Sequence, residues 1–253
     1  MKEEIYIQLL TPLPLTSRDE GKRVLELWET FLPSYLPDSC GNYEPIDQPF
    51  DLHHRDAILD HWKWPFLAKK EKPRMESSIW MRKGGMVQHA AWKFVFRFGE
   101  TDVRTLAGFV EAAAKELEVD FGCLTMLTQS EIAAGRHNGT VMPLDRKGTR
   151  FNFGITSQDV QRCIPDVYWL TIFGQPYVKM FGKDKLLCAP AHRVEAVSDA
   201  LVLVQLTPTL EDTRNEEAAF ATAKGKLKSF LGETAFYDSA RHGMNMLPNF
   251  VWR

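Results

Sequence analysis

Histidine and carboxylate side chains are densest between residues 51 and 61, where the spacing predicts a short helix. The set comprises Asp51, His53, His54, Asp56, Asp60 and His61. On a helix His54 and His61 would share one face, and ligands at such spacing can hold zinc or a transition metal. No HExxH or facial-triad spacing is present, and Asp51 is equally suited to capping a solvated helix. A cytoplasmic metal-dependent hydrolase using His53, His54, Asp56 and His61 is therefore the alternative function.

Cys188 and His192 are four residues apart, which would suit a thiolate–imidazolium pair. Pro190 lies between them and disfavours the helix that such a pair needs. The pattern favours a small buried Cys188 and a surface His192. The sequence thus predicts a protein that is not an enzyme, with no catalytic residue, cofactor or metal.

Two basic runs, residues 69–74 and 146–150, could contact phosphates. Both are expected in loops beside Pro or Gly, and neither is interleaved with aromatic residues. The net charge of −2 and the pI near 6.4 also argue against an extended nucleic-acid-binding surface. Nucleic acid is not a predicted partner.

Acidic residues gather at two helix ends. One group is expected where a helix stops and comprises Glu116, Glu118 and Asp120; the other is expected where a helix starts and comprises Glu211, Asp212, Glu216 and Glu217. Both positions suit ordinary helix-terminus charge. They would equally suit steering towards a basic partner protein.

The elements of the first half follow from apolar spacing. Alternation predicts a strand over 3–11, and Ser17 with Glu20 predicts the capping box of a helix. Gly84-Gly85 predicts a two-residue hairpin turn between strands 77–83 and 86–98, with Trp92, Phe94, Phe96 and Phe98 on the core face and Lys93 and Arg97 on the face towards water. A helix over 102–117 and a strand over 123–127 follow.

This strand–helix–strand–strand–helix–strand order is the split βαβ pattern of ferredoxin-like folds. We expect an α+β fold: an antiparallel sheet with helices packed on one face and a ferredoxin-like N-terminal half. Residues 1–134 and 135–253 would form two packed halves or one continuous domain. In the second half we expect a long polar loop over 135–157, strands over 194–197 and 201–207, and a last helix capped by Thr213 and Glu216.

The most specific stretch is residues 168–193, which holds two Phe-Gly pairs (Phe173-Gly174 and Phe181-Gly182) around Pro176-Tyr177 and ends its apolar run on Ala189-Pro190. Glycine beside so many aromatic residues indicates close backbone approach or positive φ, with the aromatic neighbours in the core. It predicts that Trp169, Phe173 and Phe181 are structural. This stretch marks a specific fold better than a chemistry.

Together with residues 41–46, 49–51 and 61–67, this stretch resembles immunity protein family fifty-two of bacterial polymorphic toxin systems. The resemblance spans roughly residues 40–210. Gln175 stands where the family often has proline, and Cys188 where it often has serine. Members of that family neutralise toxins with a restriction-endonuclease-like fold, some of them delivered by type VI secretion.

The resemblance implies an immunity protein that binds a cognate nuclease-fold toxin one to one. Six residues of the two acidic groups are then the candidate toxin-binding residues: Glu116, Glu118, Asp120, Glu211, Asp212 and Glu216. A chaperone that escorts a secreted effector is a third reading.

Composition fits a globular protein inside a reducing compartment. Hydrophobic residues make up 44% and charged residues 25% of 253 residues, which are ordinary globular values. Four widely spaced cysteines suit neither a zinc site nor a disulfide framework. The acidic N-terminus is unlike a signal peptide, and no apolar run could span a bilayer. We therefore expect a cytoplasmic location without a membrane partner.

Overall fold

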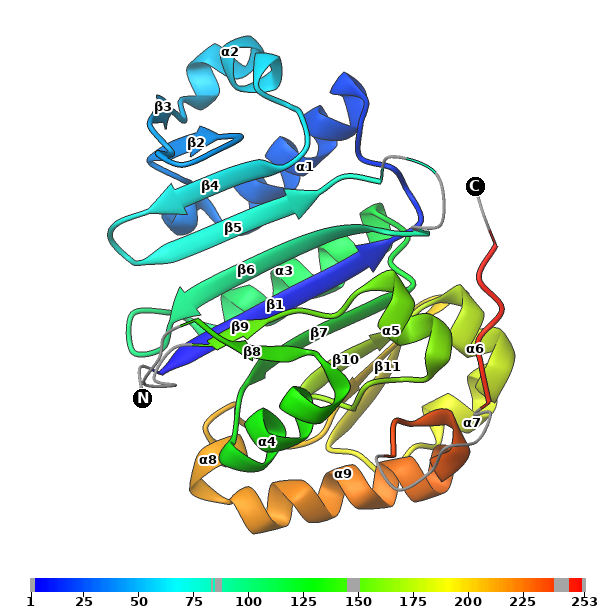
Figure 1. The fold of residues 1–253 in the computed structure, drawn as a ribbon. Helices are drawn as coiled ribbons and strands as arrows, with labels where there is room; N and C mark the ends of the chain where they lie inside the picture. Colours follow the sequence, from blue (N-terminus) through cyan, green and yellow to red (C-terminus); the bar gives the residue numbers. More distant parts are fainter. Residues whose placement is uncertain (1–2, 83, 85–87, 145–150, 239–245, 252–253) are drawn as a thin grey trace.

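The computed structural model describes residues 3–82, 84, 88–144, 151–238 and 246–251. Within these residues, strands from both halves of the chain share one ten-stranded sheet, in the order β11-β12-β10-β7-β1-β6-β5-β4-β2-β3 (Figure 1). Its strands are β1 (Glu4–Thr11), β2 (Ser39–Gly41), β3 (Gln48–Pro49), β4 (Phe66–Lys70), β5 (Met75–Trp80), β6 (Ala90–Arg97), β7 (Phe121–Met126), β10 (Leu170–Phe173), β11 (Arg193–Ser198) and β12 (Leu201–Gln205).

The helices are α1 (Arg18–Phe31), α2 (Arg55–Asp60), α3 (Val103–Glu116), α4 (Gln129–Asn138), α5 (Ser157–Arg162), α6 (Gln175–Phe181), α7 (Lys183–Leu187), α8 (Asp212–Asn215) and α9 (Glu217–Leu231). Short 3-10 helices lie at Pro33–Tyr35, Leu52–His54 and Glu233–Ala235. A second, two-stranded sheet pairs β8 (Val141–Pro143) with β9 (Phe151–Phe153). The α+β class is confirmed.

The centre of the large sheet has the predicted ferredoxin-like topology. Its strands run β7-β1-β6-β5, and each neighbouring pair is antiparallel. The expected capping box is also present, because Ser17 and Glu20 bond each other's backbone at the start of α1. Beyond β7, the pairing of β7 with β10 extends the sheet into the second half of the chain.

The predicted hairpin forms, but with a different register. Met75 lies opposite Phe96 and Trp80 opposite Ala91, and this register does not centre on Gly84-Gly85. Gly84 has φ of +78°, while Gly85 and most of the turn lie outside the described residues. The predicted two-residue turn at Gly84-Gly85 thus falls partly outside the described residues. The two strands do pair, and Trp92, Phe94 and Phe96 are buried as expected, while Phe98 is partly buried.

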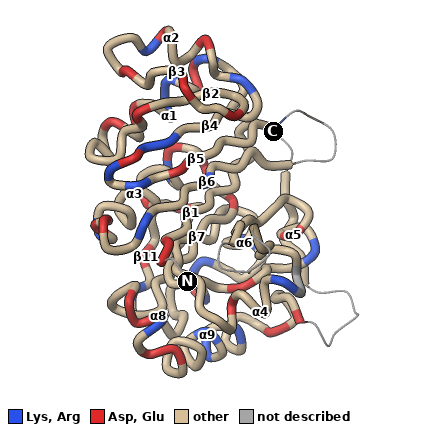
Figure 2. The backbone as a smooth tube through the Cα atoms, turned by 60° about the vertical axis from the view of Figure 1, so that its left-hand side comes forward, with Lys and Arg blue, Asp and Glu red and all other residues tan. Residues whose placement is uncertain are grey.

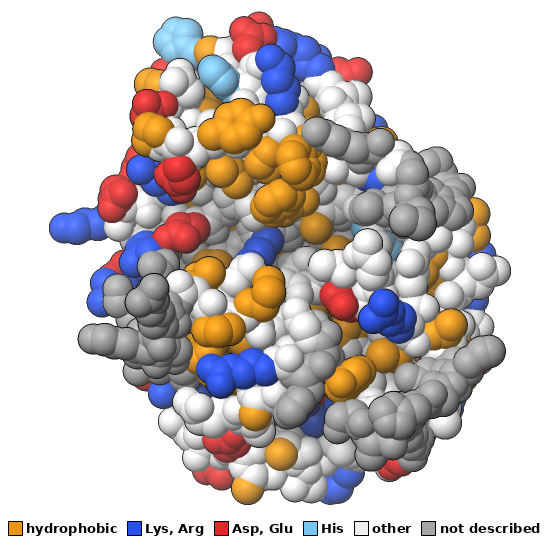
Figure 3. Space-filling view, viewed as in Figure 1, with side chains coloured by type: hydrophobic (Ala, Val, Ile, Leu, Met, Phe, Trp, Pro, Cys, Tyr) orange, Lys and Arg blue, Asp and Glu red, His pale blue; other side chains and the backbone are white. Residues whose placement is uncertain are grey.

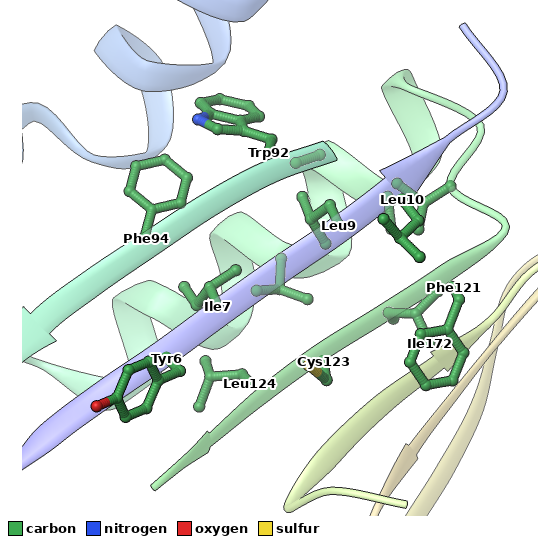
Figure 4. Close-up of a cluster of buried hydrophobic side chains, with 14 of the residues drawn as sticks. Tyr6, Ile7, Leu9, Leu10, Trp92, Phe94, Phe121, Cys123, Leu124 and Ile172 are labelled. Atoms are coloured by element: carbon green, nitrogen blue, oxygen red, sulfur yellow. The ribbon is translucent and has the colours of Figure 1, made fainter. Parts of the chain in front are cut away.

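The main core lies between the sheet and helices α1 and α3. Figure 4 shows Ile7 and Leu9 of β1 beside Phe94 and Trp92 of β6. Trp28 of α1 packs edge-on against these two aromatic rings, with ring centroids 5.4 and 5.6 Å apart. Alternation along β1 and β6 therefore directs one set of side chains into this core and the other set to the opposite face.

The opposite face is covered only over part of its width. The β8–β9 pair, α4 and α5 lie in front of β1 and β7, while β4 to β6 are less covered (Figure 1). The side chain of Gln8 attaches this cover: its amide nitrogen donates to the Ile155 carbonyl, and its oxygen accepts from the Ile155 N–H at 2.8 Å. The expected polar loop over 135–157 is thus partly an ordered second layer, with Phe151 and Phe153 buried.

The aromatic–glycine stretch forms β10, α6 and α7, and its aromatic residues are buried as predicted. Trp169, Phe173 and Phe181 are all below 9% exposed. Gly174 permits the close approach that the sequence indicated, because a Cβ there would lie 2.1 Å from the carbonyl oxygen of Val119. Any larger residue at this position would have to push the chain before β7 away.

A buried ionic network attaches α9 to the rest of the second half. Lys224 Nζ lies 2.9 Å from Glu131 of α4 and also pairs with Asp166, which Lys228 contacts as well. Burial alone would lower the pKa of Lys224, but attraction to Asp166 and Glu131 raises it above its ordinary value. Removing one partner would leave a buried charge, so this network fixes the position of α9.

The predicted capping box at Thr213 and Glu216 is wrong. Thr213 lies inside α8 and donates to the carbonyl of Leu210, and α9 starts without a side-chain cap. None of the helices in the described part of the chain is both long enough and apolar enough to cross a membrane.

Candidate functional site

The candidate metal ligands of 51–61 do not share a helix face. His53 and His54 belong to a 3-10 turn, α2 runs only from Arg55 to Asp60, and His61 follows its end. His54 Nδ1 lies 2.8 Å from Asp51, whereas Arg18 of α1 pairs with Asp56 at 2.7 Å and with Asp60 at 2.8 Å. The described residues hold no group of three or more His, Cys, Asp or Glu arranged for a metal ion. The structure therefore does not favour the hydrolase alternative.

The other early candidates also have local roles. Cys188 ends α7 and is exposed, which corrects the expected burial. Lys69 and Lys70 belong to β4 rather than to a loop, and Lys70 pairs with Asp38 at 3.3 Å. The second basic run, 146–150, lies outside the described residues.

The two acidic groups lie at opposite ends of β1. Glu116 ends α3 and Glu118 follows it, near the end of β1, where the N–H of Asp120 donates to the carbonyl of Leu10. Glu211 lies near the start of β1 in a pocket that also contains Glu3. Eight strand residues separate the ends by about 25 Å, so the two groups form separate surfaces.

Within these groups the six candidate residues differ in accessibility. Glu116, Glu118, Glu211 and Glu216 are exposed, but Asp120 is only 6% exposed and cannot contribute to a surface patch. The Asp212 carboxylate accepts a hydrogen bond from the nearby Thr209 N–H at 2.9 Å. This hydrogen bond lowers the pKa of the carboxyl. Figure 2 shows acidic and basic residues interspersed along the chain.

A groove lies on the less covered face of the sheet. It consists of two adjoining pockets of about 750 and 570 Å³ that share Ser78, Trp80, Lys93 and Asn152. Strands β4 to β6 form its floor, and segment 142–144 with segment 151–158 forms one wall. Figure 3 shows this face hollowed beside a cluster of hydrophobic side chains.

Large hydrophobic side chains line both sides of the groove. Trp64 and Trp80 stand on one side with ring centroids 5.4 Å apart, and Trp80 is 45% exposed. Met142 and Leu144 stand on the other side and are more than half exposed. Exposed aromatic and methionine side chains gathered around a concave surface are typical of binding sites.

Lys93 supplies the charge in the middle of the groove. Its ammonium donates a hydrogen bond to the side-chain oxygen of Asn152 in β9. Burial lowers the pKa of Lys93 to about 8, although attraction to Glu76 and Glu4 partly opposes this. The sequence placed Lys93 on a face towards water; instead, β9 lies over it and removes part of its hydration.

A second polar cluster, Ser157, His89 and Asp120, lies where the groove meets α5. Ser157 Oγ is 3.0 Å from His89 Nδ1, and His89 Nε2 is 3.2 Å from Asp120 Oδ2. This order of hydroxyl, imidazole and carboxylate is the one used by serine hydrolases. However, Ser157 Oγ also accepts the His89 N–H, and the three side chains are 3 to 6% exposed.

The cluster connects three elements of the fold. It joins the start of α5 to the start of β6 and to the residue before β7, and the Phe250 ring packs edge-on against His89 with centroids 4.9 Å apart. Ser157 accepts the His89 N–H and is only 4% exposed, although it lines the edge of the smaller of the two groove pockets. Sequence reasoning missed this cluster because its members are 31 to 68 residues apart.

Comparison with known proteins gives a fold likeness. No model of a known protein family matches this chain, and no curated protein matches it. A solved structure from Pseudomonas aeruginosa, the T6SS protein PA0821, has a similar fold, with a TM-score of 0.55 over 98% of this chain and 79% of that chain. The sequence identity is 15%, so the likeness concerns the fold. The resemblance to immunity protein family fifty-two stays a prediction.

Proposed function

We propose that this protein is an immunity protein of a type VI secretion system, which binds a co-encoded toxin one to one and blocks it without chemistry of its own. The observation that carries the proposal is the fold shared with a T6SS protein over 98% of the chain. The resemblance of residues 168–193 to an immunity family points in the same direction. Fold likeness alone leaves function open, and the groove adds a surface suited to a protein partner.

The proposed toxin is a nuclease with a restriction-endonuclease-like fold. A nuclease presents a basic cleft to its substrate, and acidic side chains on the immunity protein would steer the two proteins together. Glu116 and Glu118 at one end of β1, and Glu211 and Glu216 at the other, are exposed and would supply this steering. Asp120 is not, because it is buried against His89.

Co-expression with the neighbouring toxin gene tests the proposal in cells. An immunity protein restores growth when both genes are expressed, whereas an escort protein leaves the toxin active. Survival that does not depend on this chain would contradict the proposal.

Charge reversal tests the steering. Glu116→Lys and Glu211→Lys exchange exposed acids without removing a hydrogen bond that the described structure contains. We expect each to slow association several-fold with little change in dissociation, and added salt to reduce the difference. Rapid-mixing kinetics at two salt concentrations measure both rates. Equal association rates for all variants would rule out these acids as the steering surface.

A further inference from the structure

We propose that the groove is where the toxin docks, and that the docking segment is a stretch of the toxin that carries a carboxylate between apolar side chains. The carboxylate pairs with Lys93, and the apolar side chains pack against Trp64, Trp80 and Met142. The inference rests on the proposed immunity function and assigns its contact surface. It differs from acidic steering, because here the acid belongs to the toxin.

Exposed apolar side chains form the part of the groove that would bind the toxin's apolar residues. Two contacts fix the orientation of the Trp80 side chain: its indole N–H donates to Ser78 Oγ at 3.2 Å, and its ring packs against Trp64. A positioned tryptophan loses little conformational entropy on binding and buries a large area, which makes it a typical interface anchor. Met142 faces it across the groove and can adapt to an incoming side chain.

The described residues around Lys93 do not neutralise its charge by a direct ion pair. Glu4 of β1 and Glu76 of β5 attract it only through space, and each has another partner. Glu4 accepts from the Tyr6 hydroxyl at 2.8 Å, and Glu76 pairs with Arg74 at 2.5 Å. The hydrogen bond that Lys93 donates is to the neutral side chain of Asn152.

An ammonium has three donors. Among the described residues Lys93 has one hydrogen-bond partner, so it keeps donor capacity at the junction of the two pockets, where water is partly excluded and an ion pair is stronger than at an open surface. A carboxylate is the group that satisfies this cation. Its charge and the apolar walls beside it together define the docking segment.

The length of the groove favours a protein segment over a small molecule. The floor follows the chain from Val95 of β6 back to His89, just before β6, and these seven residues span about 20 Å. That length accommodates about six extended residues or three to four helical turns. One carboxylate near the middle of such a segment would face Lys93, with apolar residues on both sides facing Trp80 and Met142.

Binding of purified toxin by surface variants tests this inference. Trp80→Ala and Lys93→Met remove the anchor and the cation, and both side chains line the open groove, so both variants are expected to fold. Phe230→Ala on α9 and Lys22→Met on α1 are matched controls, because these are an exposed phenylalanine and an exposed lysine away from the groove. Circular dichroism and thermal unfolding verify that each variant is folded.

We expect the wild-type protein and both controls to bind the toxin with equal affinity. Trp80→Ala should weaken binding about 10-fold or more, and Lys93→Met about 30-fold or more. Mutating the toxin's acidic residues one at a time should reveal one whose loss has no further effect in the Lys93→Met background, which is the signature of a direct pair.

The alternatives give different results. If the wild-type protein binds and both groove variants bind equally well, the groove assignment is wrong while the immunity function stands. If the wild-type protein does not bind the toxin, the proposed function itself fails, and the inference with it. If the protein alone sediments as a dimer that Trp80→Ala dissociates, the groove belongs to a second copy of the chain, which also overturns the inference.

Discussion

Replacing Lys93 with methionine should stabilise the protein at neutral pH. The ammonium of Lys93 is partly buried between β6 and β9, and burial lowers its pKa from the ordinary 10.5 to about 8. At pH 7 both the folded and the unfolded chain carry the charge, so folding has to desolvate it. Methionine has a similar length, no charge, and the same apolar stem to pack against the groove floor.

The magnitude follows from the pKa. A pKa difference of one corresponds to about 1.4 kcal/mol, so the change from 10.5 to about 8 amounts to about 3 kcal/mol. Partial exposure reduces this to about 2 kcal/mol. Methionine also leaves the Asn152 oxygen without its donor, which costs about 1 kcal/mol. The Lys93→Met variant should therefore be about 1 kcal/mol more stable at pH 7.

The same pKa fixes the pH dependence. Between pH 8 and 10.5 the unfolded chain holds the Lys93 proton and the folded chain has released it, so this group makes stability rise with pH in that window. The wild-type protein should thus gain about 2 kcal/mol relative to Lys93→Met between pH 7 and pH 10.5. The advantage of the variant should disappear or reverse at the upper end.

Urea unfolding at pH 7 and pH 10.5 measures this difference, and comparing two variants cancels the titration of other groups. Lys22→Met, at an exposed lysine, should match the wild-type protein at both pH values. A Lys93→Met protein less stable than wild type by the same amount at both pH values would refute the reasoning. Confirmation would mean that Lys93 lowers the stability of the folded protein. Residues kept for function often have this effect.

Three further substitutions test the core and the polar cluster. Phe173→Ala empties a fully buried site and should cost about 3–5 kcal/mol in urea unfolding, and unchanged stability would contradict its core role. Gly174→Ala places a Cβ 2.1 Å from the Val119 carbonyl oxygen and should cost at least as much or prevent folding, whereas a wild-type melting temperature would show that the backbone yields freely. Ser157→Ala should cost about 1–3 kcal/mol by removing the partner of two His89 nitrogens. The wild-type protein should not hydrolyse p-nitrophenyl esters, and hydrolysis lost in Ser157→Ala would make this cluster an active site.

Local patterns were enough to predict the ferredoxin-like centre. Alternation in β1 and β6, the capping box at Ser17, and the spacing of α3 each depend on neighbouring residues, and the order of these elements permits few arrangements. The hairpin register was wrong because the Gly84-Gly85 pair alone does not fix where the strands end. The register is fixed by the pairing along the two strands, such as that of Met75 with Phe96.

The candidate site could not be predicted in the same way. The groove exists because residues 141–158 fold back over β1 and β7, and the hydrogen bonds that hold them, such as those of Gln8 with Ile155, join residues 147 positions apart. The same fold-back covers Lys93. The histidines of 51–61 show that local spacing can also mislead. Their spacing suggested a shared helix face, but α2 ends at Asp60, before His61.

Calorimetric titration of this protein with the purified toxin encoded beside it tests the central claim most directly. The account predicts one-to-one binding at nanomolar or tighter Kd, since nuclease–immunity pairs are among the tightest non-covalent complexes, with Kd down to about 10⁻¹³–10⁻¹⁶ M. It also predicts loss of nuclease activity at equimolar protein. No heat of binding, together with undiminished toxin activity at excess protein, would contradict the account.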